Sequence, residues 1–204
     1  MSEKTERVLV TTSNVAFFLP RNCVEEDSRF KQIIPYCVVM EKNTREILVY
    51  ERKGSEKRLH NFKSIGIGGH VNENDFLDLI KTLDAETTSK ITISDIVLAA
   101  LKRELYEEIN YNLTWYAYLG RTDVPASADN NVDDVHVGEM FVTLVTKEEV
   151  SVSEEIPHFE WVSLNEVSKI SNLESWSRYT LEFVKLFESL TAYKKEYFKN
   201  SQVL

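Results

Sequence analysis

Apolar, β-branched runs of strand length alternate with polar stretches along much of the chain. The strongest run covers residues 33–40, and a polar turn at residues 41–44 leads to a second run at 47–50, which together predict a β-hairpin. Further strands are predicted at residues 8–10, 15–19, 114–122, 137–146 and 159–162. The pattern therefore predicts a sheet that begins early in the chain and is completed by its later part.

Three segments place apolar residues at helical spacing, namely residues 75–83, 94–109 and 176–198. In the second segment Ser94 is a good N-cap, and Asp95 suits the positive end of the helix dipole. Asn110 follows the last apolar position, and asparagine tolerates the left-handed conformation that often ends a helix. The third segment is amphipathic and is expected to cover one side of the sheet.

The composition is typical of one folded domain. Of the 204 residues, 43% are hydrophobic and 28% are charged, which is near the average for globular proteins and excludes the disordered and fibrous classes. A chain of this length can build one sizeable core. A single domain spanning residues 1–204 is therefore expected.

The chain carries a formal net charge of −9 and contains no long run of Lys or Arg. We expect no binding to a nucleic-acid polymer, because such binding needs a basic surface. An acidic protein that acts on phosphates needs a cation to mask the repulsion between protein and substrate, so the charge balance points toward a metal ion.

Cys23 and Cys37 lack metal-type spacing and are interpreted as free thiols. The first seven residues are polar and charged, and no run of about 18 apolar residues exists in the sequence. These features predict a cytoplasmic protein without a membrane partner.

The second predicted helix carries three carboxylates on one face. Glu104, Glu107 and Glu108 lie within roughly 100° of one another around the helix axis. A charged solvent face is the ordinary explanation of such a segment. However, like charges at this spacing are unfavourable, and a hard divalent cation such as Mg²⁺ or Mn²⁺ compensates them. Arg103, one turn before Glu107, can hold that carboxylate by a forked hydrogen-bond pair.

The sequence of this segment resembles the core of the Nudix signature; it reads Arg103-Glu104-Leu105-Tyr106-Glu107-Glu108. The Gly68-Gly69 pair resembles the glycines that open this signature. In the same comparison Asp95 stands eight residues before the arginine in place of a glutamate, and Asn110 and Tyr111 replace the closing glycine and aliphatic residue. The chain is therefore similar to the Nudix hydrolases.

The resemblance covers about residues 30–190 and implies an α+β fold, with a mixed β-sheet sandwiched between α-helices. The interval from Gly69 to Arg103 is 34 residues (103 − 69), which is 20 more than the signature has. We therefore expect an insertion at about residues 73–93 inside the Nudix box, and an N-terminal extension at about residues 1–30.

The resemblance also implies the chemistry. Glu104, Glu107 and Glu108 are expected to bind Mg²⁺ or Mn²⁺, and the metal is expected to neutralise diphosphate oxygens and activate water. Glu104, Glu107 and Arg103 form the expected catalytic group. Glu139, on a predicted strand, is a candidate for the further carboxylate that the family often recruits, with an exposed strand residue as the alternative. The expected reaction is hydrolysis of a diphosphate linkage in a small nucleoside-diphosphate-linked or related substrate.

Several other side chains are candidates for contact with the substrate. The backbone at Gly66, Gly68 and Gly69 can approach phosphate, although glycines at a strand end also mark tight turns. His70 and Arg52 are expected substrate contacts, with a structural polar contact of His70 and a solvated basic loop at Arg52 as the alternatives. Weaker candidates, for which a solvated or structural role is the default, are Lys53, Arg58, Asp133, Asp134 and His136.

Two other functions remain open at this point. An isomerase of an isoprenoid diphosphate resembles the same fold, and Cys37 would be its reactive residue, although an inert buried cysteine is commoner. A non-catalytic module that binds a nucleotide and regulates a partner is the second alternative, because fold does not fix function. A homodimer is possible, since it is the commonest oligomer of soluble proteins.

Overall fold

An eleven-residue strand, β3 (Lys31–Glu41), is the centre of the sheet. It pairs in parallel with β8 (His136–Val145) along ten consecutive residues, and antiparallel with β4 (Ile47–Glu51), β6 (Gly66–Gly68) and β1 (Arg7–Thr11). The remaining strands are β2 (Ala16–Pro20), β5 (Lys63–Ser64), β7 (Ala117–Thr122) and β9 (Phe159–Val162). The sheet is therefore mixed. This computed structural model describes residues 5–12, 15–52, 62–123, 133–154, 156 and 158–201, except the side chains of Asp133 and residues 193–201.

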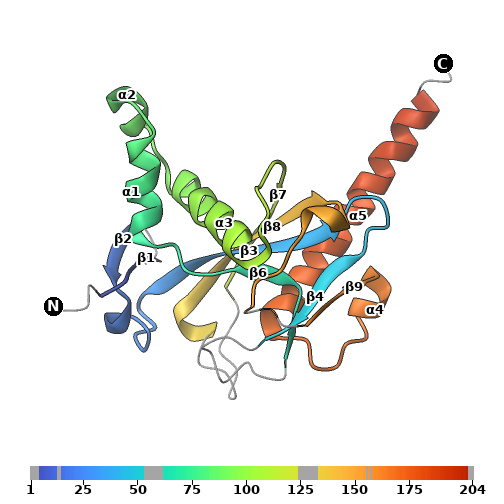
Figure 1. Cartoon of the computed structure of the whole chain (residues 1–204), viewed down its shortest axis with the longest axis horizontal. Coiled ribbons are helices and arrows are strands. Elements are labelled where there is room, and N and C mark those ends of the chain that lie inside the picture. Colours follow the sequence, from blue (N-terminus) through green and yellow to red (C-terminus); the bar gives the residue numbers. More distant parts are fainter. Residues whose placement is uncertain are drawn as a thin grey trace.

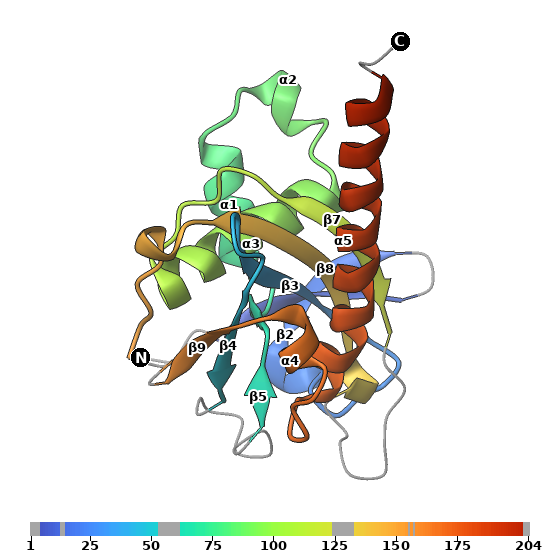
Figure 2. The ribbon, with the colours of Figure 1, turned by 90° about the vertical axis from the view of Figure 1, so that its right-hand side faces the viewer.

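Helices lie on both faces of this sheet (Figures 1 and 2). The helices are α1 (Glu73–Lys81), α2 (Ala85–Thr88), α3 (Ile93–Ile109), α4 (Leu164–Val167) and α5 (Ser175–Ser201). Helix α3 covers one face and α5 the other, while α1 and α2 extend from one end of the molecule (Figure 1). This arrangement confirms the expected α+β fold.

The alternation of side chains along β3 builds the two cores. Cys37 and Val39 face α3 and pack with Leu101 and Leu105 of that helix. The residues between them face the other way, where Val38 joins the core beneath α5. Because successive strand residues point to opposite faces, the apolar middle of this one strand serves both layers.

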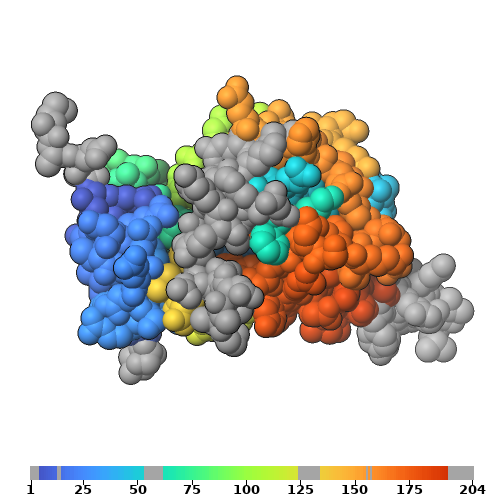
Figure 3. Space-filling view, turned by 90° about the horizontal axis from the view of Figure 1, so that it is seen from below, coloured from blue at the N-terminus to red at the C-terminus, as the bar shows by residue number. Residues whose placement is uncertain are grey.

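A third, smaller core belongs to the N-terminal segment. Val8 and Val10 of β1 pack with Val24, which follows a short 3₁₀-helix at Arg21–Cys23. In Figure 3 this part of the chain forms a distinct blue lobe beside the rest of the molecule. The lobe is attached through β1, which pairs with β3 at residues 10 and 11.

The ends of α3 were only partly predicted. Asn110 is left-handed, with φ 50° and ψ 35°, as expected for the residue that replaces a closing glycine. The expected N-cap Ser94 is wrong, because Thr92 takes that position and its side chain accepts a hydrogen bond from the Asp95 backbone. The Asp95 carboxylate in turn accepts a hydrogen bond from the backbone N–H of Thr92, which completes a capping box.

No helix within the described ranges is long and apolar enough to cross a membrane.

Candidate active site

One guanidinium group, that of Arg103 on α3, binds three carboxylates from two segments of the chain. It donates to both oxygens of Asp75 at 2.7 and 3.1 Å, and its Nη1 donates to Glu104 at 2.7 Å and to Glu107 at 2.9 Å. Its Nη2 also donates to the backbone carbonyl of His70 at 2.9 Å. Arg103 therefore fixes the rotamers of the helix carboxylates and ties α3 to the segment that follows the glycines.

Asp75, rather than Asp95, is the acidic partner of Arg103. The Asp75 side chain is only 4% exposed, whereas Asp95 lies at the start of α3 and caps its own helix. Counting back from the arginine led to Asp95, because the insertion displaces that register. Counting forward from Gly69 by the signature's own interval of six residues reaches Asp75 (75 − 69), so the signal was present in the sequence.

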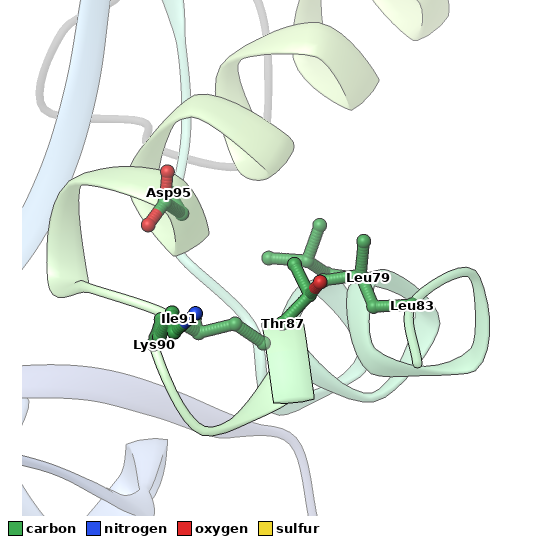
Figure 4. Close-up of a pocket in the computed structure, with 6 residues that line it drawn as sticks. All are labelled: Leu79, Leu83, Thr87, Lys90, Ile91 and Asp95. Atoms are coloured by element: carbon green, nitrogen blue, oxygen red, sulfur yellow. The ribbon is translucent and has the colours of Figure 1, made fainter. Parts of the chain in front are cut away.

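The expected insertion would then enter the signature between Asp75 and the start of α3. Helix α1 begins at Glu73, so its first turn holds Asp75 against Arg103 while the rest of α1 and α2 extends outward. A hollow of about 250 Å³ lies between these helices and the start of α3 (Figure 4). Its lining residues, Leu79, Leu83, Thr87, Lys90, Ile91 and Asp95, belong to none of the Arg103 contacts.

Glu104 is the most buried carboxylate of the helix face, with 8% of the residue exposed. Burial raises the pKa of Glu104 to about 7, and the charge of Arg103 opposes that rise. Gly69 lies directly against it, since a Cβ at that position would be 2.4 Å from Oε1 of Glu104. Glycine is required here because the backbone approaches the carboxylate so closely.

The other two helix carboxylates are closer to solvent. The Glu107 side chain is 57% exposed, and Glu108 is half-buried one turn after Glu104. Beside these carboxylates, Val97, Ala100, Leu101, Leu105 and Ile109 of α3 are buried. The acidic face therefore meets the protein body along one side and solvent along the other.

This donor set fits a hard divalent ion. Mg²⁺ commonly binds one or two carboxylates and completes its shell with water and substrate phosphate. Glu104 and Glu107 share one nitrogen of Arg103, which brings their oxygens together. Within the described ranges, no three His, Cys, Asp or Glu side chains alone gather around one point, so water and substrate oxygens would complete the shell.

Glu139 lies on β8 and faces the same side of the sheet as α3. Tyr118 donates a hydrogen bond to its Oε2 at 2.7 Å, and Arg121 lies 3.5 Å from its Oε1. Burial and the Glu139 carboxylate together raise the pKa of Tyr118 to about 12. The Glu139 side chain is 15% exposed, so the alternative of an exposed strand residue does not apply to Glu139. Glu139 is paired with Pro35 of β3, and β6 with Gly68 lies on the other side of β3.

The other glycines are explained by packing. A Cβ at Gly68 would be 1.9 Å from the carbonyl oxygen of Pro35, and one at Gly66 would be 2.0 Å from the ring of Tyr36. Both glycines let β6 approach β3. Any contact of their backbone with phosphate remains a prediction.

Arg52 lies over a buried polar network that the sequence gave no sign of. The network is built around Glu174, which is 5% exposed and accepts hydrogen bonds from Tyr36 at 2.8 Å and from Ser64 and Ser177. Nη1 of Arg52 lies 3.9 Å from the second oxygen of Glu174. A buried carboxylate thus restricts where this arginine can lie.

His70 and His136 meet side by side. Their Nε2 atoms are 3.2 Å apart, and their rings pack edge to face. Burial, followed by the charges of Arg21, His136 and Arg103, holds the pKa of His70 well below its usual value. The neutral imidazole of His70 therefore dominates at neutral pH.

The remaining candidates divide into three groups. Lys53, Arg58 and the side chain of Asp133 lie outside the described residues. Asp134 is exposed. Cys37 is fully buried, and burial raises the pKa of its thiol far above the ordinary value, which leaves no accessible thiol at this strand.

The fold and this acidic helix define a class of enzyme, and comparison with known proteins agrees. Residues 31–184 match the NUDIX domain family. Protein YmaB of Bacillus subtilis (strain 168) is 29% identical over 173 residues, which is 81% of this chain and 76% of YmaB. The chain therefore belongs to the Nudix family and is a hydrolase that acts on phosphoric anhydrides.

Two solved structures extend the comparison. The crystal structure of Tm1382, a candidate Nudix hydrolase, is 27% identical, with a TM-score of 0.63 over 90% of this chain and 99% of that one. The NUDIX domain of Shewanella oneidensis NrtR, complexed with ADP ribose, has a TM-score of 0.51 at 12% identity, covering 76% of this chain and 86% of that one. The second likeness concerns the fold alone.

Replacing Asp75 tests which acid holds Arg103. Asp75→Asn is expected to lower the free energy of unfolding by about 2–4 kcal/mol, because it leaves a partly buried guanidinium without its bidentate partner. The matched change Asp95→Asn affects an exposed capping box, and because the amide oxygen can still accept from Thr92, it is expected to cost only about 0.5–1 kcal/mol. Urea denaturation measures both, and equal losses would contradict the assignment of Asp75.

Removing the charge of Glu104 tests its raised pKa. In the chelator-treated protein, the folded state retains the Glu104 proton between the ordinary value of 4.5 and about 7. Stability from this group is therefore present at low pH and is lost as pH rises through 7. The free energy of unfolding of Glu104→Gln, relative to that of the native protein, should therefore rise by on the order of 2 kcal/mol from pH 5 to pH 8. Urea denaturation at the two pH values measures this gain, and parallel pH profiles would rule the effect out.

Proposed function

We propose that this protein is a Mg²⁺- or Mn²⁺-dependent hydrolase that cleaves the diphosphate linkage of a nucleoside-diphosphate-linked or related small substrate. The observation that carries the proposal is the simultaneous binding of Asp75, Glu104 and Glu107 by Arg103. Nudix hydrolases generally use a divalent metal, and this arrangement holds hard carboxylate oxygens at the surface of a rigid helix.

Glu104, Glu107 and Glu108 would hold the metal, which when bound masks phosphate charge and lowers the pKa of a water molecule. Arg103 keeps Glu104 and Glu107 in fixed rotamers, so little reorganisation is needed when the substrate arrives. Its bond to the carbonyl of His70 holds the glycine segment at the same time. The helix face and the glycine segment are thereby presented to the substrate as one unit.

Glu139 is proposed as a further carboxylate that helps to orient the attacking water. Its backbone lies two strand spacings, roughly 10 Å, from β6 on the face of the sheet that α3 covers, and its carboxylate rests against Tyr118 and Arg121 of β7. Tyr118 and Arg121 hold its two oxygens, and they would keep the carboxylate in place during water attack.

Arg52, His70 and the backbone of Gly68 and Gly69 are proposed to contact the substrate. The partly buried Arg52 rests near Glu174 and can present its remaining donors to a phosphate. ADP ribose is a sensible first substrate to test, because the NUDIX domain of NrtR is complexed with it. A homodimer and a cytoplasmic location stay proposals from the sequence.

The isomerase alternative has lost its support, since it needs an accessible thiol where Cys37 is fully buried. A purely regulatory role would not explain why Arg103 holds Asp75, Glu104 and Glu107 together. The experiment below distinguishes this role, because it would show nucleotide binding without turnover.

The proposal predicts metal-dependent cleavage that needs Glu107. The protein is incubated with ADP ribose, nucleoside triphosphates and other nucleoside diphosphate derivatives in Mg²⁺ or Mn²⁺, and the products are separated by ion-exchange chromatography. We expect AMP and ribose phosphate, or the corresponding products, and no turnover in chelator. Glu107→Gln should lower kcat by about a hundredfold or more, because it removes charge that stabilises the transition state.

Glu86→Gln is the matched control, since Glu86 is an exposed helical glutamate that pairs with Lys90 outside the cluster. It should retain native activity. Tight nucleotide binding without turnover of any panel member would overturn the hydrolase proposal in favour of a regulatory module, and equal losses in the two variants would remove Glu107 from the site.

A further inference from the structure

A second polar cluster lies on the face of the sheet opposite α3. It consists of His70, His136, Gln32 and Asn72. The two histidines make the contact already described, with 3.2 Å between their Nε2 atoms. Unlike the acidic helix, this cluster consists of neutral side chains, whose imidazole nitrogens and amide oxygens can serve as ligand atoms for a metal ion.

Strand register places Gln32, His136 and Asn72 on one face, and His70 joins them through its contact with His136. Gln32 of β3 is the direct partner of His136 on β8, and it is also opposite Val10 on β1. Asn72 is opposite Val8 in an isolated bridge. Paired residues share a face, and Val8 and Val10 both pack in the small N-terminal core rather than under α3. The cluster therefore lies where the N-terminal lobe joins the main sheet.

The cluster contains polar atoms without partners. Gln32 is fully buried, and neither its Oε1 nor its Nε2 has a hydrogen-bond partner. Oδ1 of Asn72 also makes no full hydrogen bond, but the Asn72 side chain faces the backbone N–H of Asp75 in the capping box of α1. In the described part of the chain these are the only buried side-chain oxygen or nitrogen atoms in that state. Because an unpaired buried amide costs free energy, its persistence beside two imidazoles points to a ligand.

The spacing of the imidazoles suits a transition-metal ion. Two nitrogens at the usual Zn–N distance of about 2.0–2.1 Å and at a tetrahedral angle are roughly 3.3 Å apart, close to the 3.2 Å between these Nε2 atoms. We propose that His70 and His136 form a second metal site, for an imidazole-preferring divalent ion such as Zn²⁺, with amide oxygens of Gln32 and Asn72 nearby. It is separate from the carboxylates of α3.

The surrounding charges permit a cation there. The arginine charges that lower the pKa of His70 belong to Arg21 and Arg103. Arg21 is paired with Glu6 at 3.1 Å and Glu25 at 2.8 Å, and Arg103 is paired with the three carboxylates of the active site. Carboxylates therefore outnumber guanidinium groups, and the neutral imidazole of His70 is the form that binds a metal.

A metal bound here would restrict the motion of a segment that contacts the candidate active site. The carbonyl of His70 accepts a hydrogen bond from Arg103, and the backbone nitrogen of Asn72 donates to Asp75 at 2.7 Å. Fixing the His70 imidazole to β8 would immobilise the segment that positions both members of that ion pair. The second site thus connects the N-terminal lobe to the catalytic helix without supplying any group to the reaction.

Zinc binding to the metal-free, full-length protein tests the site. Zn²⁺ is added to the protein in competition with a chromophoric chelator, and excess Mg²⁺ is present throughout to occupy hard carboxylate sites. We expect one Zn²⁺ per chain to remain bound, with its affinity reduced at least about tenfold in His136→Ala and in His70→Ala. His158→Ala is the control, because His158 is exposed and outside the cluster, and it should bind as the native protein does.

Nuclear magnetic resonance of the native protein keeps the test independent of variant folding. Zn²⁺ should shift the imidazole nitrogens of His70 and His136 and leave those of His158 unchanged. The proposal is overturned if Zn²⁺ leaves these two imidazoles unshifted, if Mg²⁺ displaces it, or if folded His136→Ala retains the native affinity. In each case the two rings would share only a hydrogen bond.

Discussion

The ion pair between Arg103 and Asp75 is the constraint on which the active site depends. Glutamates one turn apart on a helix repel one another, and burial of Glu104 makes its charge still less favourable. A single guanidinium offsets both effects because its donors form a fork that several carboxylates can share. Asp75 in turn fixes the guanidinium, so a buried acid far away in sequence determines where the exposed Glu107 lies.

The expected insertion is compatible with this arrangement, because Asp75 and Arg103 form their ion pair across it. The first turn of α1 supplies Asp75, and α3 supplies Arg103, so the additional residues only lengthen the connection between two fixed points. Lengthening a loop whose ends are held adds little entropy cost. The close approach of Gly69 to Glu104 fixes the other side of the site, where a larger residue would displace the carboxylate.

Much of this could be predicted from local sequence. The strands, the three main helices and the buried stripe of α3 follow from apolar periodicity, and Asn110 was correctly expected in the left-handed conformation. The predictions that failed concerned non-local contacts or a choice between neighbouring residues. Thr92 replaced Ser94 as the cap, and Asp75 replaced Asp95 because the pairing crosses the insertion. The register of Gln32 with His136 joins strands a hundred residues apart, which no local pattern encodes.

A double-mutant cycle on kcat tests the central claim most directly, with Asp75→Asn and Arg103→Gln made singly and together. If Asp75 acts only by holding Arg103, the second change adds little to the first, and the two residues show a coupling energy of about 1–3 kcal/mol. Additive losses in kcat would contradict the account, because they would mean that the two residues support the reaction independently.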